Sequence, residues 1–176
     1  MIHNSNLKIS IIVAIDEKRG IGKADKIPWH IRQDLIRLKN LTIGHVTILG
    51  RTTFESMLGY YEKSGRPTMS MRIHIVVTRD PNYSVEPKYG FAVHSIEEAI
   101  SLAKEKEPEE IFIIGGAQIF QQAIDKGVVD RLYLTKVEGD FDCDTFFPDY
   151  SVFKKVLKEE EGEENGMKYK YINLEK

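Results

Sequence analysis

The sequence has 176 residues, of which 41% are hydrophobic and 30% are charged, and its formal net charge is −2 at pH 7. This length fits one domain, which we expect to span residues 1–176, and the composition is ordinary for a soluble globular protein. The small negative charge provides no overall positive field, so binding to nucleic acid is disfavoured. Any site for an anionic ligand must be local.

The number of cysteines and the lengths of the hydrophobic runs indicate the compartment in which the protein works. Cys143 is the only cysteine, so an internal disulfide is excluded and a reducing compartment, the cytoplasm, is expected. Apolar runs such as residues 9–15 are far shorter than the roughly 20 residues of a membrane-spanning helix. The first ten residues lack the pattern of a signal peptide, and we expect no contact with a membrane.

Short runs of β-branched residues alternate with amphipathic segments along the chain. This alternation is typical of an α/β fold in which helices cover a sheet. The strand segments are apolar throughout, as expected for parallel strands buried on both faces. The predicted strands are residues 8–15, 46–49, 73–78, 91–93, 110–114 and 131–137. The predicted helices are residues 31–41, 53–58, 96–106 and 117–122, the last ending at 122 or slightly beyond.

The first predicted helix carries an acid on its apolar face. Ile31, Leu35, Leu38 and Leu41 recur at spacings of three and four, and Asp34 lies within the face that they form. Burying a carboxylate without a partner is costly, and natural proteins rarely keep one without a reason. Asp34 is therefore a candidate functional residue.

Two interpretations of Asp34 are open at this point. It could be a surface carboxylate paired with Arg37, and periodicity alone does not decide the matter. Trp29, the only tryptophan, favours a pocket, because its large ring and N–H group could form a wall beside the helix, although ordinary core packing is an alternative. In an apolar pocket the pKa of Asp34 would be raised, which suits binding or protonating a neutral heterocycle.

The next strand is followed by a possible anion site. Arg51 comes after the strand at residues 46–49, and Thr52-x-x-Glu55 has the spacing of a capping box at the start of a helix. The N-terminus of a helix has unpaired N–H groups and partial positive charge, so it attracts anions. Taken alone this pattern is weak, since many capped helices bind no ligand.

Two further strands end in similar residues. Thr78 and Arg79 close the strand at residues 73–78, and Gly115-Gly116 separates an apolar strand from a helix, although a lone Gly-Gly pair also suits a simple tight turn. Ligands of open α/β sheets bind at the carboxyl ends of strands, which indicates one extended phosphorylated ligand. Arg51 and Arg79 suit a 2′-phosphate better than a free ribose.

Common nucleotide and metal motifs are missing from the sequence. Gly20-Ile-Gly22 lacks the third glycine of the dinucleotide fingerprint, and no glycine-rich loop ends in Gly-Lys-Ser/Thr. The histidines have no metal-ligand spacing, so no metal site is predicted. At the end of the chain, Asn165-Gly166 separates two extended patterns, residues 153–160 and 167–174, which predicts an antiparallel hairpin at the sheet edge.

Segments along nearly the whole chain resemble the dihydrofolate reductase family. They are VAIDEKRGIG, IPW with Asp34-Leu35 after it, ILGRTTFESM, IFIIGGAQIF, LYLT and DTFFPDY. The resemblance implies a central, mostly parallel eight-stranded sheet with an antiparallel C-terminal edge and four helices. It also implies a cytoplasmic monomer that reduces 7,8-dihydrofolate to 5,6,7,8-tetrahydrofolate with NADPH, through hydride transfer to C6 and protonation of N5, for one-carbon metabolism.

The same resemblance implies roles for individual residues. Asp34 would hold the 2-amino group and N3 of the pterin, Thr135 would hydrogen-bond to that carboxylate, and Trp29 would contact it through water. The implied substrate site consists of Ile12, Val13, Asp34, Leu35, Leu38, Met57, Arg72, Ile114 and Thr135. The implied cofactor site consists of Ala14, Ile21, Gly22, Arg51, Thr52, Thr53, Thr78, Arg79, Gly115, Gly116, Ala117, Gln118, Ile119, Phe120 and Gln122. The family also implies a cis Gly115–Gly116 peptide and a mobile loop over residues 16–29.

One assignment and two alternative functions stay open. Arg72 would bind the glutamate carboxylate of the substrate, but MSMRIH replaces the family's usual turn here, so Arg66 is a competitor. A pyrimidine reductase of riboflavin synthesis would share the fold and cofactor but lacks the segment from Trp29 to Asp34. A non-catalytic nucleotide-binding module would leave the acid on the apolar face unexplained.

Overall fold

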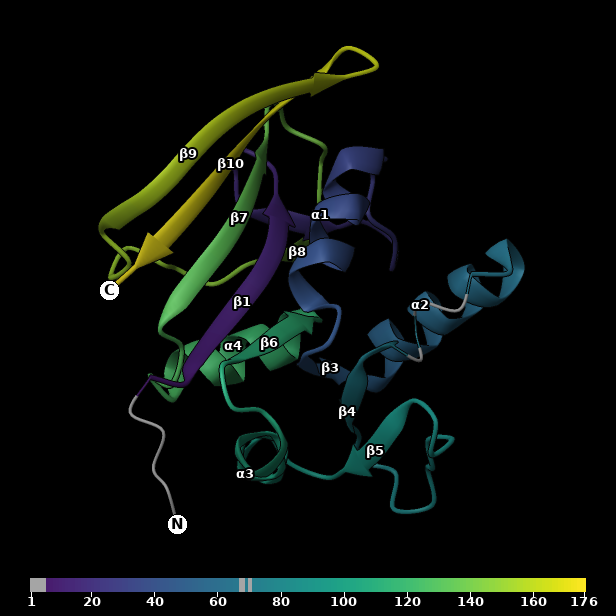
Figure 1. The fold of residues 1–176 in the computed structure, drawn as a ribbon. Helices are drawn as coiled ribbons and strands as arrows, with labels where there is room; N and C mark the ends of the chain where they lie inside the picture. Colours follow the sequence, from purple (N-terminus) through teal and green to yellow (C-terminus); the bar gives the residue numbers. More distant parts are fainter. Residues whose placement is uncertain (1–5, 67–68, 70) are drawn as a thin grey trace.

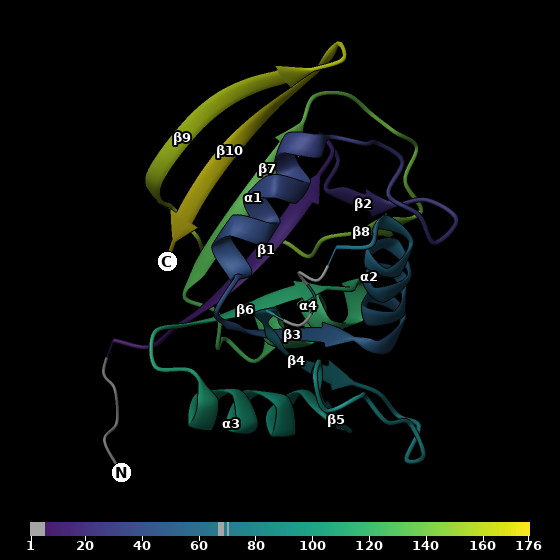
Figure 2. The same cartoon turned by 45° about the vertical axis from the view of Figure 1, so that its right-hand side comes forward.

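The computed structural model describes residues 6–66, 69 and 71–176, which form the helices and strands labelled in Figure 1 and Figure 2. The helices are α1 (Arg32–Thr42), α2 (Arg51–Ser64), α3 (Ile96–Lys106) and α4 (Ala117–Asp125). The strands are β1 (Lys8–Ile15), β2 (Gly20–Gly22), β3 (Val46–Gly50), β4 (Ile73–Val77), β5 (Gly90–Val93), β6 (Glu110–Gly115), β7 (Arg131–Val137), β8 (Thr145–Phe146), β9 (Lys155–Glu164) and β10 (Met167–Glu175).

Eight of these strands form one sheet in the order β5-β4-β3-β6-β1-β7-β10-β9. The six strands from β5 to β7 run parallel to their neighbours, and β10 is antiparallel to both β7 and β9. The α/β class, the mostly parallel sheet with an antiparallel C-terminal edge, and the four helices are therefore confirmed. All six predicted inner strands are present within one residue of their predicted ends.

Helices cover both faces of this sheet (Figure 2). Alternate residues of β1, among them Ile11 and Val13, belong to one core cluster with the buried residues of α3 and α4. Ile12 points the other way and packs with Leu38 and Leu41 of α1. This follows from the period of two along a strand, which sends successive side chains to opposite faces. No helix of the described ranges is long and apolar enough to cross a membrane.

The start of α2 differs from the sequence prediction. The helix begins at Arg51, its N-cap is Gly50, and no side chain caps it. The predicted capping box at Thr52 is therefore wrong, because Thr52 already lies inside the first turn. Glu55 instead accepts a hydrogen bond from Nε of Arg51 at 3.0 Å, one helical turn away.

The end of α2 also lies beyond the prediction, at Ser64 rather than residue 58. Gly59 lowers helix propensity by about 1 kcal/mol relative to alanine, so the sequence favoured an earlier end. The helix continues because Leu58 and Tyr61 on either side of the glycine pack against the cluster around Phe54. Gly65 ends it in the left-handed conformation, with φ of 66°.

A second, small sheet pairs β2 with β8. Neither strand is predicted from the sequence, because segments of three and two residues are too short to display a period. The pairing brings the loop after β1 against the segment after β7. A side chain at Gly20 would not fit there, since its Cβ would lie 2.5 Å from Cβ of Cys143.

The N-terminus of α1 is capped from the far end of the chain. Its N-cap residue, Ile31, offers no hydrogen-bonding side chain. The Glu164 carboxylate at the end of β9 accepts hydrogen bonds from the backbone N–H groups of Arg32, at 2.6 Å, and Gln33, at 3.1 Å. A negative charge at this end also interacts favourably with the helix dipole. The C-terminal hairpin thus holds the helix that carries Asp34.

Replacing Glu164 by alanine should lower the free energy of unfolding by about 1 kcal/mol, because two N–H groups of α1 lose a charged acceptor. Urea denaturation followed by circular dichroism measures this change. Glu163→Ala, at the exposed neighbouring position, is the matched control and should have little effect. Equal effects of the two substitutions would contradict the cap.

Candidate active site

A cavity of about 1080 Å³ lies at the carboxyl ends of the parallel strands. Its lining includes Gly50 at the end of β3, Thr78 after β4, His94 after β5 and Gly116 after β6. This is where open α/β sheets bind ligands. The walls also contain many of the residues predicted from the sequence: Ala14, Ile21, Gly22, Trp29, Asp34, Leu35, Leu38, Arg51, Thr52, Thr53, Met57, Arg79, Ala117, Gln118, Ile119 and Gln122.

Asp34 lies in the first turn of α1 and lines the cavity. Its Oδ1 accepts a hydrogen bond of 2.5 Å from the hydroxyl of Thr135, a buried residue of β7. Burial raises the pKa of Asp34 above its ordinary value, while the Thr135 hydrogen bond and the charge of Arg37 oppose that increase. The expectation of a desolvated carboxylate on the apolar face of α1 is therefore met.

Arg37 is not the surface partner of Asp34 that one interpretation expected. Its guanidinium donates to the carbonyl oxygen of Leu134, to the hydroxyl of Thr135 and to Oδ1 of Asn173. All three acceptors belong to strands of the sheet. The surface-pair interpretation is wrong because the end of the Arg37 side chain is drawn toward β7 and β10.

Apolar side chains surround the Asp34 end of the cavity. Trp29 is only 8% exposed and packs edge-to-face against Phe141, with 5.1 Å between ring centroids. Leu35 and Ile27, which are 36% and 61% exposed, both line the cavity. A flat, partly apolar ligand would cover these exposed surfaces and exclude water from the carboxylate.

The opposite end of the cavity suits an anion. Helices α2 and α4 both begin there, and their N-cap residues, Gly50 and Gly116, provide no capping side chain. The unpaired N–H groups of both helix ends can therefore bind phosphate. The peptide bond between Gly115 and Gly116 is cis, as the resemblance implied. A Cβ at Gly116 would lie 3.2 Å from Oγ1 of Thr53, so glycine keeps this approach open.

The two candidate arginines at this end differ in their contacts. Arg51 forms ion pairs with Glu55 and Asp80, at 3.0 and 3.3 Å, and its Cζ lies 4.5 Å from the ring centroid of Tyr83. Arg79 is exposed, and its side chain has no ion-pair partner among the described residues. Arg79 is therefore free to bind an anion, whereas Arg51 is held in place by two acids.

Several predicted residues do not line this cavity directly. Phe120 packs in the core against Phe147, with 5.2 Å between ring centroids. Ile12 packs in a cluster with Leu38, which lines the cavity. Thr135 hydrogen-bonds to Asp34, which also lines it. The remaining residues in this group are Val13, Gly115 and Ile114. Their predicted ligand contacts stay predictions.

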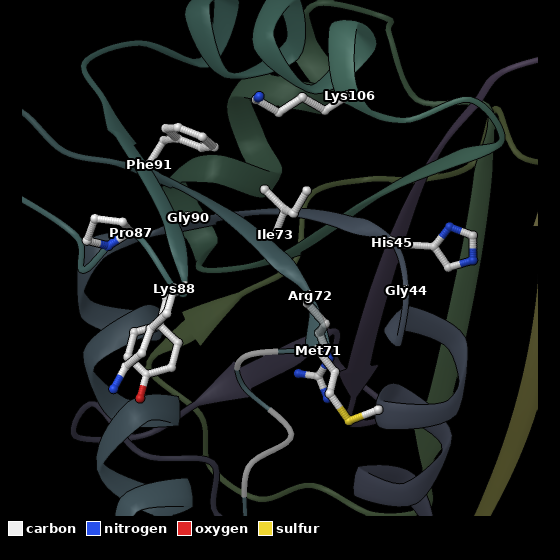
Figure 3. Close-up of a pocket in the computed structure, with 11 residues that line it drawn as sticks. Gly44, His45, Met71, Arg72, Ile73, Pro87, Lys88, Gly90, Phe91 and Lys106 are labelled. Carbon is white, nitrogen blue, oxygen red and sulfur yellow. The ribbon is translucent and has the colours of Figure 1, made fainter.

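Arg72 does not line the large cavity. It is 3% exposed, and none of its guanidinium nitrogens has a hydrogen-bond partner in the described part of the chain. It lines a smaller cavity of about 370 Å³, in which it points away from Phe91 and Lys106 (Figure 3). Its Cζ is 5.8 Å from the ring centroid of Tyr61, which lines the large cavity. Its competitor Arg66 is exposed.

Some lining residues were missed in the sequence analysis. Tyr60 and Tyr61 belong to the part of α2 beyond its predicted end. His94 and Ser95 follow β5, and the rule on strand ends that selected Arg51 would have found them too. Lys26 and His30 come from the irregular loop, which has no period to indicate which side chains face a ligand.

Comparison with known proteins agrees with this geometry. The family model for dihydrofolate reductase matches residues 8–176. Dihydrofolate reductase of Staphylococcus aureus (strain Mu50 / ATCC 700699) is 40% identical over 145 residues, which cover 82% of this chain and 80% of the relative. The Staphylococcus haemolyticus enzyme is 43% identical over 144 residues, covering 82% of this chain and 78% of the relative.

A solved structure is similar over a still larger part of the chain. It is dihydrofolate reductase from Enterococcus faecalis complexed with NADP(H) and RAB-propyl. It has 32% sequence identity and a TM-score of 0.79, and the match covers 96% of this chain and 95% of that one. The matched region contains every strand and helix around the cavity, including the segment from Trp29 to Asp34. The chain therefore belongs to the dihydrofolate reductase family of NADPH-dependent oxidoreductases, which reduce dihydrofolate to tetrahydrofolate.

Proposed function

We propose that the chain reduces dihydrofolate at the large cavity and that Asp34 binds the pterin ring. The observation that carries this proposal is a single, half-buried carboxyl group with a raised pKa at the apolar end of the cavity. The other acids of the lining, Asp25 and Glu97, are exposed. Asp34 is therefore the acid best placed to act on a ring that is shielded from water.

The two oxygens of Asp34 have different roles. Oδ1 accepts a hydrogen bond from the hydroxyl of Thr135, whereas Oδ2 accepts no hydrogen bond from the described residues. Oδ2 is thus available for the N–H donors of a pterin. Once ionised, the carboxylate stabilises positive charge on the bound ring, which raises the pKa of the ring nitrogens and favours protonation at N5. Trp29, Leu35 and Ile27 exclude water and strengthen this electrostatic effect.

The residues at the other end of the cavity fit NADPH. The helix N-termini after Gly50 and Gly116 would hold the pyrophosphate, and Arg79 with Arg51 would hold the 2′-phosphate. When bound, NADPH supplies the hydride that reduces C6 of dihydrofolate. The cavity extends from these groups to Asp34 without interruption, so cofactor and substrate can occupy one continuous site.

Arg72 is proposed to bind the glutamate carboxylate of dihydrofolate. Burial of a guanidinium without an acceptor is costly, so a bound anion would remove an unfavourable state. Its Cζ lies 5.8 Å from the ring centroid of Tyr61, and Tyr61 lines the large cavity. The exposed side chain of Arg66 carries no such cost, which makes it the weaker candidate.

We further propose that the chain forms one dihydrofolate reductase-like domain, works as a monomer in the cytoplasm and does not bind nucleic acid. The free thiol of Cys143 and the formal net charge of −2 support a reducing compartment and a small-molecule partner. Light scattering on the purified protein tests the oligomeric state directly.

Asp34→Asn should lower the turnover of dihydrofolate at neutral pH by about 100-fold or more, because the amide cannot stabilise positive charge on the ring. The loss should be smaller at acid pH, where some substrate is already protonated. The decrease in NADPH absorbance measures both rates. Asp125→Asn, an exposed acid of α4, serves as control; unchanged turnover in Asp34→Asn would remove Asp34 from the mechanism.

Replacing both Arg51 and Arg79 by alanine should lower the preference for NADPH over NADH by about tenfold or more, since charge-assisted hydrogen bonds to the extra phosphate are lost. The ratio of kcat/KM for the two cofactors measures the effect. Lys104→Ala removes an exposed charge from α3 and should leave the ratio as it is. A ratio unaltered in the double variant would refute the 2′-phosphate assignment.

Arg72→Leu should raise KM for dihydrofolate by about tenfold or more, and Arg66→Leu should change it much less. With a dihydropterin substrate that lacks the glutamate, the difference in KM between Arg72→Leu and the wild type should disappear. Steady-state kinetics with both substrates make this comparison. A larger effect of Arg66→Leu would transfer the carboxylate site to Arg66.

A further inference from the structure

We propose that Arg37 is a positioning residue that directs the hydroxyl of Thr135 onto Asp34. This inference rests on the proposed role of Asp34 in binding the pterin. Arg37 lies one turn after Asp34 on α1, but it reaches the carboxylate through β7 rather than by direct pairing. It lines no part of the cavity, so it acts on the ligand only through its neighbours.

Contacts with two strands fix the Arg37 guanidinium. Nη1 donates to the carbonyl oxygen of Leu134 and to Oγ1 of Thr135, both at 3.2 Å, and Nη2 donates to Oδ1 of Asn173 at 2.6 Å. The guanidinium also lies over Tyr171, with Cζ 4.3 Å from the ring centroid. A planar group with several donors and one aromatic face is thereby held in a single orientation.

This geometry determines where the Thr135 proton goes. A guanidinium has donors only, so the bond between Arg37 and Thr135 uses an N–H of the arginine and a lone pair of the hydroxyl. The hydroxyl has one proton, and the acceptor within 2.5 Å is Oδ1 of Asp34. Arg37 therefore favours the rotamer in which Thr135 donates to the carboxylate, which leaves Oδ2 for the ligand.

The positive charge of Arg37 also favours a carboxylate that can bind the ligand. It lowers the pKa of Asp34 against the increase caused by burial, and so favours the ionised form. The groups facing this pair come from three strands: Thr135 and Tyr133 on β7, Tyr171 on β10, and Glu160 on β9. Among the described groups that act on Asp34, the one cation is Arg37. Its own pKa is lowered by burial, but a guanidinium stays charged at neutral pH.

Three variants separate this role from simple packing. Arg37→Met removes the charge and the donors but keeps an unbranched apolar stem. Arg37→Lys keeps the charge and loses the planar group with its several donors. Arg32→Met is the matched control, because it removes an exposed cation from the first turn of the same helix.

The primary measurement is the ¹³C NMR titration of the Asp34 carboxyl group, which needs no substrate. Arg37→Met should move the titration midpoint to higher pH, and the part of the pH dependence of kcat/KM that is due to Asp34 should move with it. Its turnover at neutral pH should fall about tenfold. Arg37→Lys should restore the midpoint but not the full turnover, and Arg32→Met should behave like the wild type.

An Asp34 titration and a pH profile that are unchanged in Arg37→Met, with only lower stability, would reduce Arg37 to a packing residue and overturn the proposal. If Arg37→Met does not fold, Arg37→Lys still decides, since wild-type turnover in that variant would also overturn it. Failure of the proposed function would give a different result. The wild type would then not turn over dihydrofolate, but the Asp34 titration would still shift in Arg37→Met.

Discussion

The contact between Asp34 and the buried strand β7 is the interaction on which the site depends. Thr135 donates to the carboxylate at 2.5 Å, and the surrounding protein raises the pKa of the acid. A charge in such surroundings is costly, so α1 must be held firmly against the sheet for the carboxylate to stay there. Glu164 caps the start of that helix, and hydrogen bonds from Arg37 attach its middle to β7 and β10.

The parallel part of the sheet provides the rest of the site. Because the carboxyl ends of β3, β4, β5 and β6 meet at one edge, helix N-termini and arginines from distant parts of the chain face one cavity. The antiparallel hairpin of β9 and β10 contributes differently, because it supplies Glu164 and Asn173, which position α1. The two kinds of strand pairing thus serve ligand binding and helix placement, respectively.

Local patterns predicted most of the fold, and contacts between distant segments account for most errors. Apolar runs identified the inner strands, and the helical period placed Asp34 on its face. The partner of Arg37 and the cap from Glu164 could not be predicted, because the contacting residues are 98 and 132 positions apart. The end of α2 was wrong because packing around Tyr61 outweighed the low propensity of Gly59.

The protonation of Asp34 in the folded protein decides whether this site can bind a pterin in the way described. A ¹³C NMR titration of its carboxyl group, assigned by the loss of the signal in Asp34→Asn, gives the pKa without any ligand. Because burial raises the pKa of Asp34, we expect a midpoint above 3.8, the ordinary value for this side chain. A midpoint at or below that value would mean that the carboxylate is well solvated or fully neutralised, which would contradict a desolvated acid poised to bind the pterin.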